Sequence, residues 1–197
     1  LALLQEGKIK VKGHIYAYDL NNDLINVYKT IQNHQEELYQ SLQEYYNEYD
    51  SCPDVIEKIN RNPDSLEEAK KCKENFYYWM RNEYNKNKLN IIESSALFII
   101  LNKTCFRGLY RVGPNGFNVP YGHYKKTPTL ISREHLNQIK ELIKDVKFIH
   151  SDFSESFKNI KKGDFVYLDP PYAPEKSNSF VNYTNEGFGI EQHKLLF

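Results

Sequence analysis

The sequence predicts an α/β fold with a parallel sheet. Two observations indicate it: short apolar strand patterns recur along the chain, and patterns of helical period separate them. Strands that alternate with helices are typical of parallel sheets, because a helical crossover lets the next strand run in the same direction. The 197 residues, 40% of them hydrophobic, suit one domain with an insert and can bury a sizeable core, so global disorder is excluded.

Each element is predicted from the spacing of its apolar residues. The clearest helix carries Ala96, Leu97, Ile100 and Leu101 on one side. In chain order, the predicted elements are a strand over 14–18, a helix over 21–30, helical structure within 35–90, a helix over 93–103, a helix over 132–146, a strand over 147–150, a short helix over 154–160 and a strand over 165–168.

Local signals refine this outline. Residues 65–68, Ser-Leu-Glu-Glu, form a capping box, which predicts a helix that runs from there toward Asn85. Proline and polar residues at 50–53 and 62–63 predict breaks. The run 113–116, Gly-Pro-Asn-Gly, contains Asn-Gly between two short runs and therefore predicts a β-hairpin.

Charge and cysteine content exclude several classes of protein. The 26 Lys and Arg residues balance 26 Asp and Glu residues, so there is no basic coat, and any contact with nucleic acid must come from a local patch. Cys52, Cys72 and Cys105 form no Cys-x-x-Cys pair and are odd in number, which favours reduced thiols over a disulfide framework or zinc cage. No apolar run reaches the length of a membrane span, and the histidines form no ligand pair, so we expect neither membrane nor metal.

The sharpest chemical signal is Asp169-Pro170-Pro171-Tyr172, directly after the predicted strand over 165–168. Ligands of open α/β sheets bind beyond the carboxyl ends of the strands. Two prolines fix φ and remove two amide donors, so this loop is stiff and presents outward carbonyl oxygens. Asp169 and the Pro170 carbonyl can accept the two N–H bonds of a planar amino group while Tyr172 stacks on its ring. A plain strand-ending turn is the alternative.

At this point the chain resembles the Dam-like DNA adenine-N6 methyltransferases. The tetrapeptide matches their catalytic motif. The run 101–111, Leu-Asn-Lys-Thr-Cys-Phe-Arg-Gly-Leu-Tyr-Arg, and the run 116–122, Gly-Phe-Asn-Val-Pro-Tyr-Gly, look like the helix and hairpin with which the family reads DNA. The resemblance covers nearly the whole chain and is weakest over 35–75.

The resemblance implies a fold and a reaction. Residues 1–34 and 145–197 would form a Rossmann-like sheet that depends on S-adenosyl-L-methionine, and 35–144 an inserted helical and β-hairpin region for target recognition. The enzyme would methylate N6 of an adenine flipped out of double-stranded DNA, with GATC as the expected site and no metal. It would act in the cytoplasm, as a bacterial, phage or viral-type enzyme, in restriction-modification or in repair and regulation. The implied catalytic residues are Asp169, Pro170, Pro171 and Tyr172.

Four residues are implied to bind the cofactor. Asp19 matches the acidic residue that holds the ribose hydroxyls, and a helix N-cap is its alternative role. Asp152 and Phe153 match the position that meets the cofactor adenine, the carboxylate at the amino group and the phenyl group at the ring. A helix cap near Ser154 is the alternative there. Asp169 is the fourth.

A basic segment is the predicted DNA footprint. From Lys103 to Arg133 the chain has six basic residues and no Asp or Glu, an asymmetry that favours contact with phosphates. A solvated face is the alternative. The six are Lys103, Arg107, Arg111, Lys125, Lys126 and Arg133.

The resemblance gives several of these residues, and some of their neighbours, individual roles. Arg111 would read a guanine, for which a bidentate Arg has the right geometry. Phe106 would wedge into the duplex, with core packing as its alternative, and Arg107 stands where relatives often carry Asn. Pro120 and Tyr124 would touch bases or backbone. Lys125 and Lys126 would contact phosphates.

Other functions remain as alternatives. An amino methyltransferase of RNA, cytosine N4 or protein glutamine is one, although relatives that act on cytosine or glutamine tend to have Ser or Asn at the position of Asp169. A non-catalytic DNA-binding remnant is another. The family places a strand and a Gly-rich cofactor loop before the position of Leu1, and helices after that of Phe197. We therefore expect these 197 residues alone to bind cofactor poorly and to methylate little.

Overall fold

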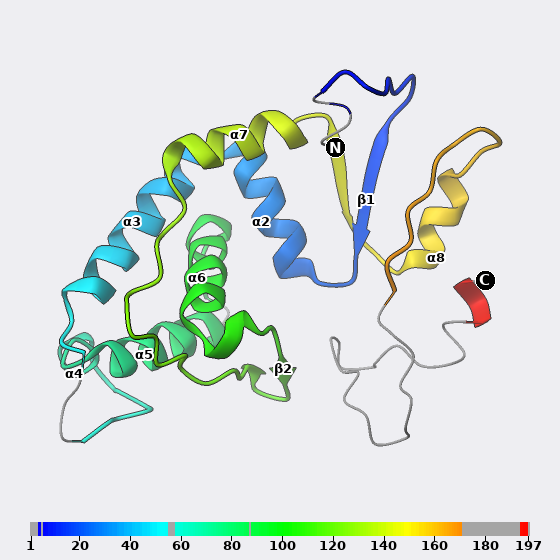
Figure 1. Ribbon diagram of the computed structural model, residues 1–197. Helices are drawn as coiled ribbons and strands as arrows, with labels where there is room; N and C mark the ends of the chain where they lie inside the picture. The colour runs from blue at the N-terminus through cyan, green and yellow to red at the C-terminus, as the bar shows by residue number, and fades with distance from the viewer. Residues whose placement is uncertain (1–3, 5, 55–57, 87, 171–193, 197) are drawn as a thin grey trace.

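The computed structural model describes residues 4, 6–54, 58–86, 88–170 and 194–196, in which helices predominate over two small sheets (Figure 1). No helix in this part of the chain is both long and apolar enough to cross a membrane. In chain order the elements are β1 (Ile15–Asp19), α2 (Asn22–Asn33), α3 (Gln35–Ser51), α4 (Leu66–Ala69), α5 (Lys73–Asn85), α6 (Ile91–Thr104), η1 (Phe106–Gly108), β2 (Val112–Gly113), β3 (Gly116–Phe117), α7 (Arg133–Ile143), β4 (Val146–His150), α8 (Phe153–Ser156) and η2 (Phe157–Asn159).

The parallel pairing that the sequence predicts is present between β1 and β4. Ile15 is opposite Val146 at one end of the pair, and Asp19 is opposite His150 at the other. Both strands therefore end at the same edge, although more than a hundred residues separate them in the chain. This confirms a mixed α/β fold with a parallel sheet.

Helix α2 packs against this strand pair, and α8 lies on its other side (Figure 1). The ring of Tyr28 on α2 stacks on that of Phe148 in β4, with 4.6 Å between centroids. Gln32 Nε2 donates to the carbonyl oxygens of Ile143 and Val146, at 2.7 and 2.9 Å. These contacts join α2, the end of α7 and the start of β4, so the sheet and the helical region share one core.

The main core lies among the helices of the central region. Ala96, Leu97, Ile100 and Leu101 of α6 are all at most 1% exposed, as their spacing predicts. Helix α6 packs against α2, α3 and α5. Where it meets α2, the hydroxyls of Thr30 on α2 and Ser95 on α6 lie 3.0 Å apart. A hydrogen bond satisfies both buried hydroxyls, so this polar pair is compatible with the apolar core.

Side-chain caps determine where three of the helices begin. The Oδ1 atoms of Asn21 and Asn90 each accept two amide hydrogen bonds at the starts of α2 and α6, and Ser132 Oγ accepts one from His135 N at the start of α7. The predicted helices at 21, 93 and 132 therefore start within two residues of the observed ones.

The prediction of one helix from Ser65 toward Asn85 is wrong. Ser65 Oγ accepts from Glu68 N, as a cap should, but α4 ends at Ala69 and α5 starts at Lys73. The amide of Lys73 donates to the carbonyl oxygen of Pro53 (2.9 Å) instead of continuing the helical ladder. A tertiary contact thus interrupts a helical pattern, and Cys72 Sγ caps the new helix.

The predicted hairpin is present and is anchored to α5. Strands β2 and β3 are antiparallel, and Gly116 has a φ of +92°, which a glycine tolerates best. Asn85 at the end of α5 accepts from the amide of Phe117 and donates to its carbonyl oxygen, both at 2.9 Å. A Cβ at Gly116 would lie 2.4 Å from Asn85 Oδ1, so the close approach also requires glycine.

The predicted strand over 165–168 is not formed. Its backbone has no ladder in the structure, and the side chains of Phe165 and Tyr167 are 91% and 77% exposed. A strand needs a neighbour to pair its backbone groups. Among the residues that the structure describes, β1 and β4 pair only with each other, and neither pairs with this segment.

Candidate functional site

The parallel pair brings Asp19 and Asp152 to the same edge of the sheet. Asp19 is the last residue of β1, and Asp152 follows β4 by two positions. The amide of Ser151 donates to the carbonyl oxygen of Asp19 at 3.1 Å, and His150 Nε2 lies 3.1 Å from the carbonyl oxygen of Leu20. The two loops that carry the predicted cofactor carboxylates are therefore joined directly.

Each of these carboxylates uses one oxygen locally. Asp19 Oδ1 accepts from Asn21 N at 2.6 Å, while Asn21 itself caps α2. Asp152 Oδ1 accepts from Ser154 N at 2.9 Å and caps α8, which is the alternative role foreseen for it. No hydrogen bond to the second oxygen of either side chain is present in the described part of the chain. Each half-buried carboxylate can therefore hold its position and still accept from a hydroxyl or amino group.

An aromatic side chain follows this edge. The partly buried ring of Phe153 meets Phe157 edge-on, with 5.8 Å between centroids. Asn159 Nδ2 donates to the hydroxyl of Tyr18 at 2.6 Å, which fixes the α8–η2 turn beside β1. An apolar ring thus lies next in the chain to Asp152, as an adenine site requires.

The predicted catalytic tetrapeptide is only half described. Asp169 is exposed and Pro170 is half-buried, whereas Pro171 and Tyr172 lie outside the described residues. Within the described residues, no hydrogen bond or ion pair holds the Asp169 carboxylate, and none joins it to Asp19 or Asp152. The carboxylate is accessible to a ligand, and the structure does not bring it into contact with the other two.

The segments around Phe106 and Pro120 lie side by side. Phe106 N donates to the carbonyl oxygen of Pro120 at 2.8 Å, and Gly122 N donates to that of Thr104 at 2.9 Å. The hydroxyl of Tyr124 donates to the carbonyl oxygen of Cys105, also at 2.9 Å. Three predicted DNA contacts, Phe106, Pro120 and Tyr124, are exposed residues of this one surface.

Phe106 is not a core residue. Its side chain is 41% exposed, and the guanidinium of Arg107 lies 5.0 Å from its ring centroid. Arg107 has a φ of +56°, a left-handed conformation that is uncommon for a residue with a side chain. The backbone strain and the exposed ring occur together where the sequence predicts contact with DNA, and strained residues cluster at functional sites.

Arg111 is held by the hairpin itself. Its Nε donates to Asn118 Oδ1 at 2.6 Å, and its Nη2 donates to the Asn118 carbonyl oxygen at 3.1 Å. Lys125 and Lys126 are exposed and have no ion pair with any described residue. Arg133, by contrast, pairs with Glu36 at 3.0 Å in the structure, with both side chains about half exposed.

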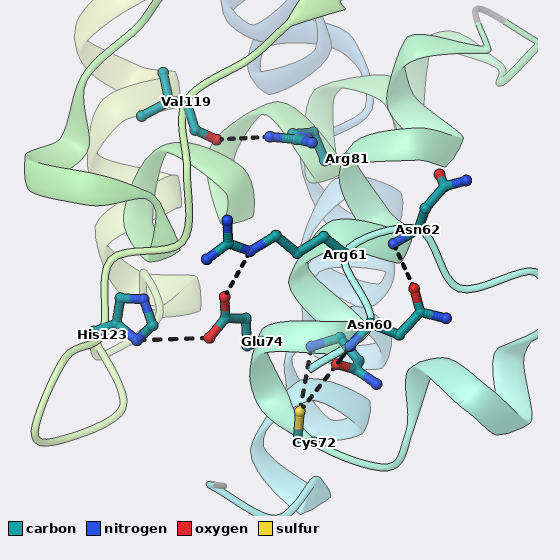
Figure 2. Close-up of polar contacts among 9 residues, drawn as sticks. Asn60, Arg61, Asn62, Cys72, Glu74, Arg81, Val119 and His123 are labelled. Atoms are coloured by element: carbon teal, nitrogen blue, oxygen red, sulfur yellow. Dashed lines mark hydrogen bonds and ion pairs between the residues drawn. The ribbon is translucent and has the colours of Figure 1, made fainter. Parts of the chain in front are cut away.

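Residues of the helical region that the sequence analysis missed lie against the same segment (Figure 2). Tyr77 Oη and Arg81 Nη1 both donate to the carbonyl oxygen of Val119, at 2.7 and 3.2 Å. His123 Nδ1 lies 3.7 Å from Glu74, whose other oxygen lies 3.5 Å from Arg61 Nε. Tyr77 and Arg81 are four residues apart, so both lie on one helix face, and this spacing was the sequence signal that could have indicated a shared partner.

Burial controls the titrating groups beneath this surface. Burial raises the pKa of the Cys105 thiol to about 11 and that of the Tyr110 phenol to about 12. Both groups are therefore neutral near pH 7, and Cys105 is not an activated nucleophile. In the described part of the chain, no three His, Cys, Asp or Glu side chains are grouped to hold a metal ion.

Comparison with known proteins supports the resemblance. The family model of D12 class N6 adenine-specific DNA methyltransferases matches residues 7–197. The type II methyltransferase M.MjaIII of Methanocaldococcus jannaschii is 37% identical over 98% of this chain and 62% of its own length. The DNA N-6-adenine-methyltransferase of Escherichia phage P1 is 30% identical over 90% of this chain and 21% of its own.

The DNA adenine methylase of Escherichia coli K12 is 29% identical over 90% of this chain and 56% of its own length. The chain thus spans less than two thirds of the length of each of these three relatives. The match of the family model nevertheless covers almost all of it, including the tetrapeptide at 169–172 and the hairpin segment. The chain belongs to the D12 class N6 adenine-specific DNA methyltransferase family.

Proposed function

We propose that the protein transfers a methyl group from S-adenosyl-L-methionine to N6 of an adenine in double-stranded DNA. The observation that carries the proposal is the match of residues 7–197, the tetrapeptide at 169–172 included, to a family described as N6 adenine-specific DNA methyltransferases. Residues 1–34 and 145–197 would form the Rossmann-like catalytic part, and 35–144 the target-recognition region. The three buried cysteines, which form no disulfide, fit a reducing compartment such as the cytoplasm.

The chemistry at the strand edge supports a site for the methyl donor. The second oxygen of Asp19 accepts no hydrogen bond from the described residues and suits the vicinal hydroxyls of a ribose. That of Asp152 is in the same state and suits the amino group of an adenine. The ring of Phe153 supplies an apolar face for that base. When bound, the donor supplies a methyl group on a positively charged sulfur, which is a good leaving group. Asp169 would be the fourth residue of this site for the methyl donor.

The tetrapeptide supports the second half of the reaction. An exocyclic amine of adenine is a poor nucleophile, because its lone pair is delocalised into the ring. Hydrogen bonds from its two N–H groups to Asp169 and to the Pro170 carbonyl oxygen would favour a pyramidal nitrogen and free that pair. Asp169 would also stabilise the positive charge that develops on N6 during transfer. Tyr172 would stack on the base, and Pro171 would hold the loop stiff.

DNA recognition is assigned to the surface around Phe106 and the hairpin. The target adenine must leave the duplex, because its amino group is unreachable while it is paired and stacked. Phe106 would fill the space that it leaves, and Arg111 would read a guanine in the major groove. Lys125, Lys126 and Arg107 would contact phosphates, with Pro120 and Tyr124 beside them. We expect GATC as the site.

The test is methylation by the purified full-length protein of a duplex that contains GATC, with labelled S-adenosyl-L-methionine. We expect N6-methyladenine in the product, mapped to GATC by sequencing, and no transfer by Asp169→Ala. Label in cytosine N4, in RNA or in protein glutamine would overturn the choice of substrate. Duplex binding without any binding of the methyl donor would show a non-catalytic remnant.

A further inference from the structure

The helical region carries two arginines, Arg61 and Arg81, outside the basic segment at 103–133, and they lie near His123 of that segment. Arg61 lies in the loop between α3 and α4, Arg81 lies on α5, and His123 follows the hairpin. Figure 2 shows the side chain of Arg61 between Arg81 and Glu74, on the side that faces His123. Three segments that are distant in sequence therefore place basic side chains beside one another.

Tyr78 holds the two arginines in place. Its ring is buried (3% exposed), and the guanidinium carbons of Arg61 and Arg81 lie 5.7 and 4.6 Å from its centroid. Guanidinium groups are attracted to aromatic faces, and less entropy is lost on binding when a side chain is already ordered. The arginines are thus preorganised although Arg61 is exposed.

Glu74 orients Arg61 from the other side. Its carboxylate is 7% exposed, and its Oε1 lies 3.5 Å from Arg61 Nε while Oε2 lies 3.7 Å from His123 Nδ1. No hydrogen bond to the buried Oε1 is present, so the ion pair with Arg61 is its compensation among the described residues. The carboxylate occupies the Nε edge of the guanidinium. The terminal nitrogens of this 70% exposed side chain remain available.

This group adjoins the surface assigned to DNA. Arg81 donates to the carbonyl oxygen of Val119, the residue before Pro120. His123 precedes Tyr124, Lys125 and Lys126 in the chain. The two arginines of the helical region therefore lie beside the segment that carries Lys125 and Lys126, with the buried carboxylate of Glu74 between Arg61 and His123.

We propose that Arg61 is a contact to a DNA backbone phosphate, and that Glu74 is the positioning residue that aims it. Two terminal N–H groups on a planar, permanently charged fork match a phosphate in geometry and charge. The inference rests on the proposed function, because it requires duplex DNA on the hairpin surface. It extends the interface to the loop between α3 and α4, which contains no run of basic residues.

The test of Arg61 is the salt dependence of duplex binding. In the full-length protein, log affinity should fall with log salt less steeply for Arg61→Gln, with the negative slope shallower by about 1, as the loss of one phosphate contact requires. The weakening between 50 and 200 mM salt should then be about fourfold smaller than for the unaltered protein. The preference for GATC over other sequences should not change. Lys10→Gln, an exposed charge on the N-terminal segment, is the matched control and should leave the slope unchanged.

The test of Glu74 is whether its replacement weakens or strengthens duplex binding. A carboxylate that merely lies near DNA repels it, so its removal would strengthen binding. We expect Glu74→Gln to weaken duplex binding instead, because Arg61 loses its orientation. The same change made in the Arg61→Gln protein should then have little further effect. Stronger binding by Glu74→Gln, or equal losses in both backgrounds, would overturn the positioning role.

Failure of this inference and failure of the proposed function give different results. If the unaltered protein binds no duplex and methylates none, the proposed function is wrong. If it methylates DNA and Arg61→Gln keeps the full salt slope, only the contact at Arg61 is wrong. Thermal unfolding of each variant separates these outcomes from loss of the fold.

Discussion

The main-chain amide of Ser151 donates a hydrogen bond to the carbonyl oxygen of Asp19 across the end of the strand pair. The loops after β1 and β4 therefore cannot move apart without breaking a backbone contact. Asp19 and Asp152, the two carboxylates assigned to the methyl donor, are carried by these loops. Their separation is thus determined by the sheet rather than by flexible chain.

Asp19→Ala and Asp152→Asn should each weaken binding of S-adenosyl-L-methionine by about 1.5–3 kcal/mol, the usual effect of losing a hydrogen bond to a charged group. Asparagine at 152 retains the oxygen that caps α8, so the fold is not the variable there. Calorimetric titration of the full-length protein measures the loss. Asp145→Asn, an exposed acid beside β4 at the opposite edge of the sheet, is the control and should bind the donor normally.

Asp169→Ala should abolish methyl transfer while leaving duplex binding largely intact. The side chain is exposed and makes no hydrogen bond with any described residue, so its removal has little to do with folding. Parallel assays of transfer and of duplex affinity make the comparison. Loss of DNA binding together with activity would contradict a role at the amino group.

Arg111→Ala should reduce the preference for the cognate site by about 1–3 kcal/mol, because a bidentate contact to guanine distinguishes that base from the others. Asn118→Ala should act in the same direction but more weakly, since it removes the Oδ1 that accepts from Arg111 Nε and keeps the main-chain carbonyl that accepts from Nη2. The ratio of cognate to non-cognate affinity is the measurement. An unchanged ratio for Arg111→Ala would exclude base reading by this residue.

Stability should fall as the pH rises from about 9 to 12. Burial raises the pKa values of Cys52 and Cys105 to about 11 and that of Tyr110 to about 12. Between the ordinary and the raised value the unfolded chain has lost a proton that the folded chain retains. The free energy of unfolding therefore falls by about 1.4 kcal/mol per pH unit for each such group.

Urea unfolding at a series of pH values checks this. Tyr110→Phe isolates one group, because among the described residues its hydroxyl makes only a long hydrogen bond, 3.5 Å, to Asn21. Between pH 10 and 12 the free energy of unfolding of the variant should fall less steeply with pH, by about 1.4 kcal/mol per pH unit, the contribution of one proton. A variant as steep as the unaltered protein would mean that Tyr110 ionises in the folded state at its ordinary pKa.

Local sequence patterns were sufficient for much of the fold. Caps at Asn21 and Ser132, apolar spacing around Leu97 and the Asn-Gly pair at 115–116 all act within a few residues. The elements that they predict are present. The alternation of strands and helices predicted a parallel sheet, and the structure shows which two strands pair, β1 with β4.

The errors have tertiary causes. The helix predicted from Ser65 is interrupted because the carbonyl of Pro53 takes the amide of Lys73. The apolar run at 165–168 is a strand only if a neighbour pairs with it, and the described residues provide none. The ion pair of Arg133 with Glu36 was not predicted either, because Glu36 lies almost a hundred residues away in the chain.

Tertiary contacts also limited how much of the candidate site could be predicted from the sequence. Arg61 is isolated among polar residues in the sequence, and only the folded chain places it beside Tyr78 and Glu74. For Asp19 and Asp152, order along the chain was enough, because parallel strands bring their ends together. The roles of these residues remain predictions.

The carbonyl oxygen of Val119 accepts hydrogen bonds from both Tyr77 and Arg81, and the Asn85 side chain hydrogen-bonds the amide and the carbonyl oxygen of Phe117. One helix therefore supports the hairpin from beneath at two successive points. An engineer who wishes to exchange target specificity between relatives should transplant α5 along with the hairpin. A hairpin grafted alone would lack the α5 side chains that hydrogen-bond its main chain.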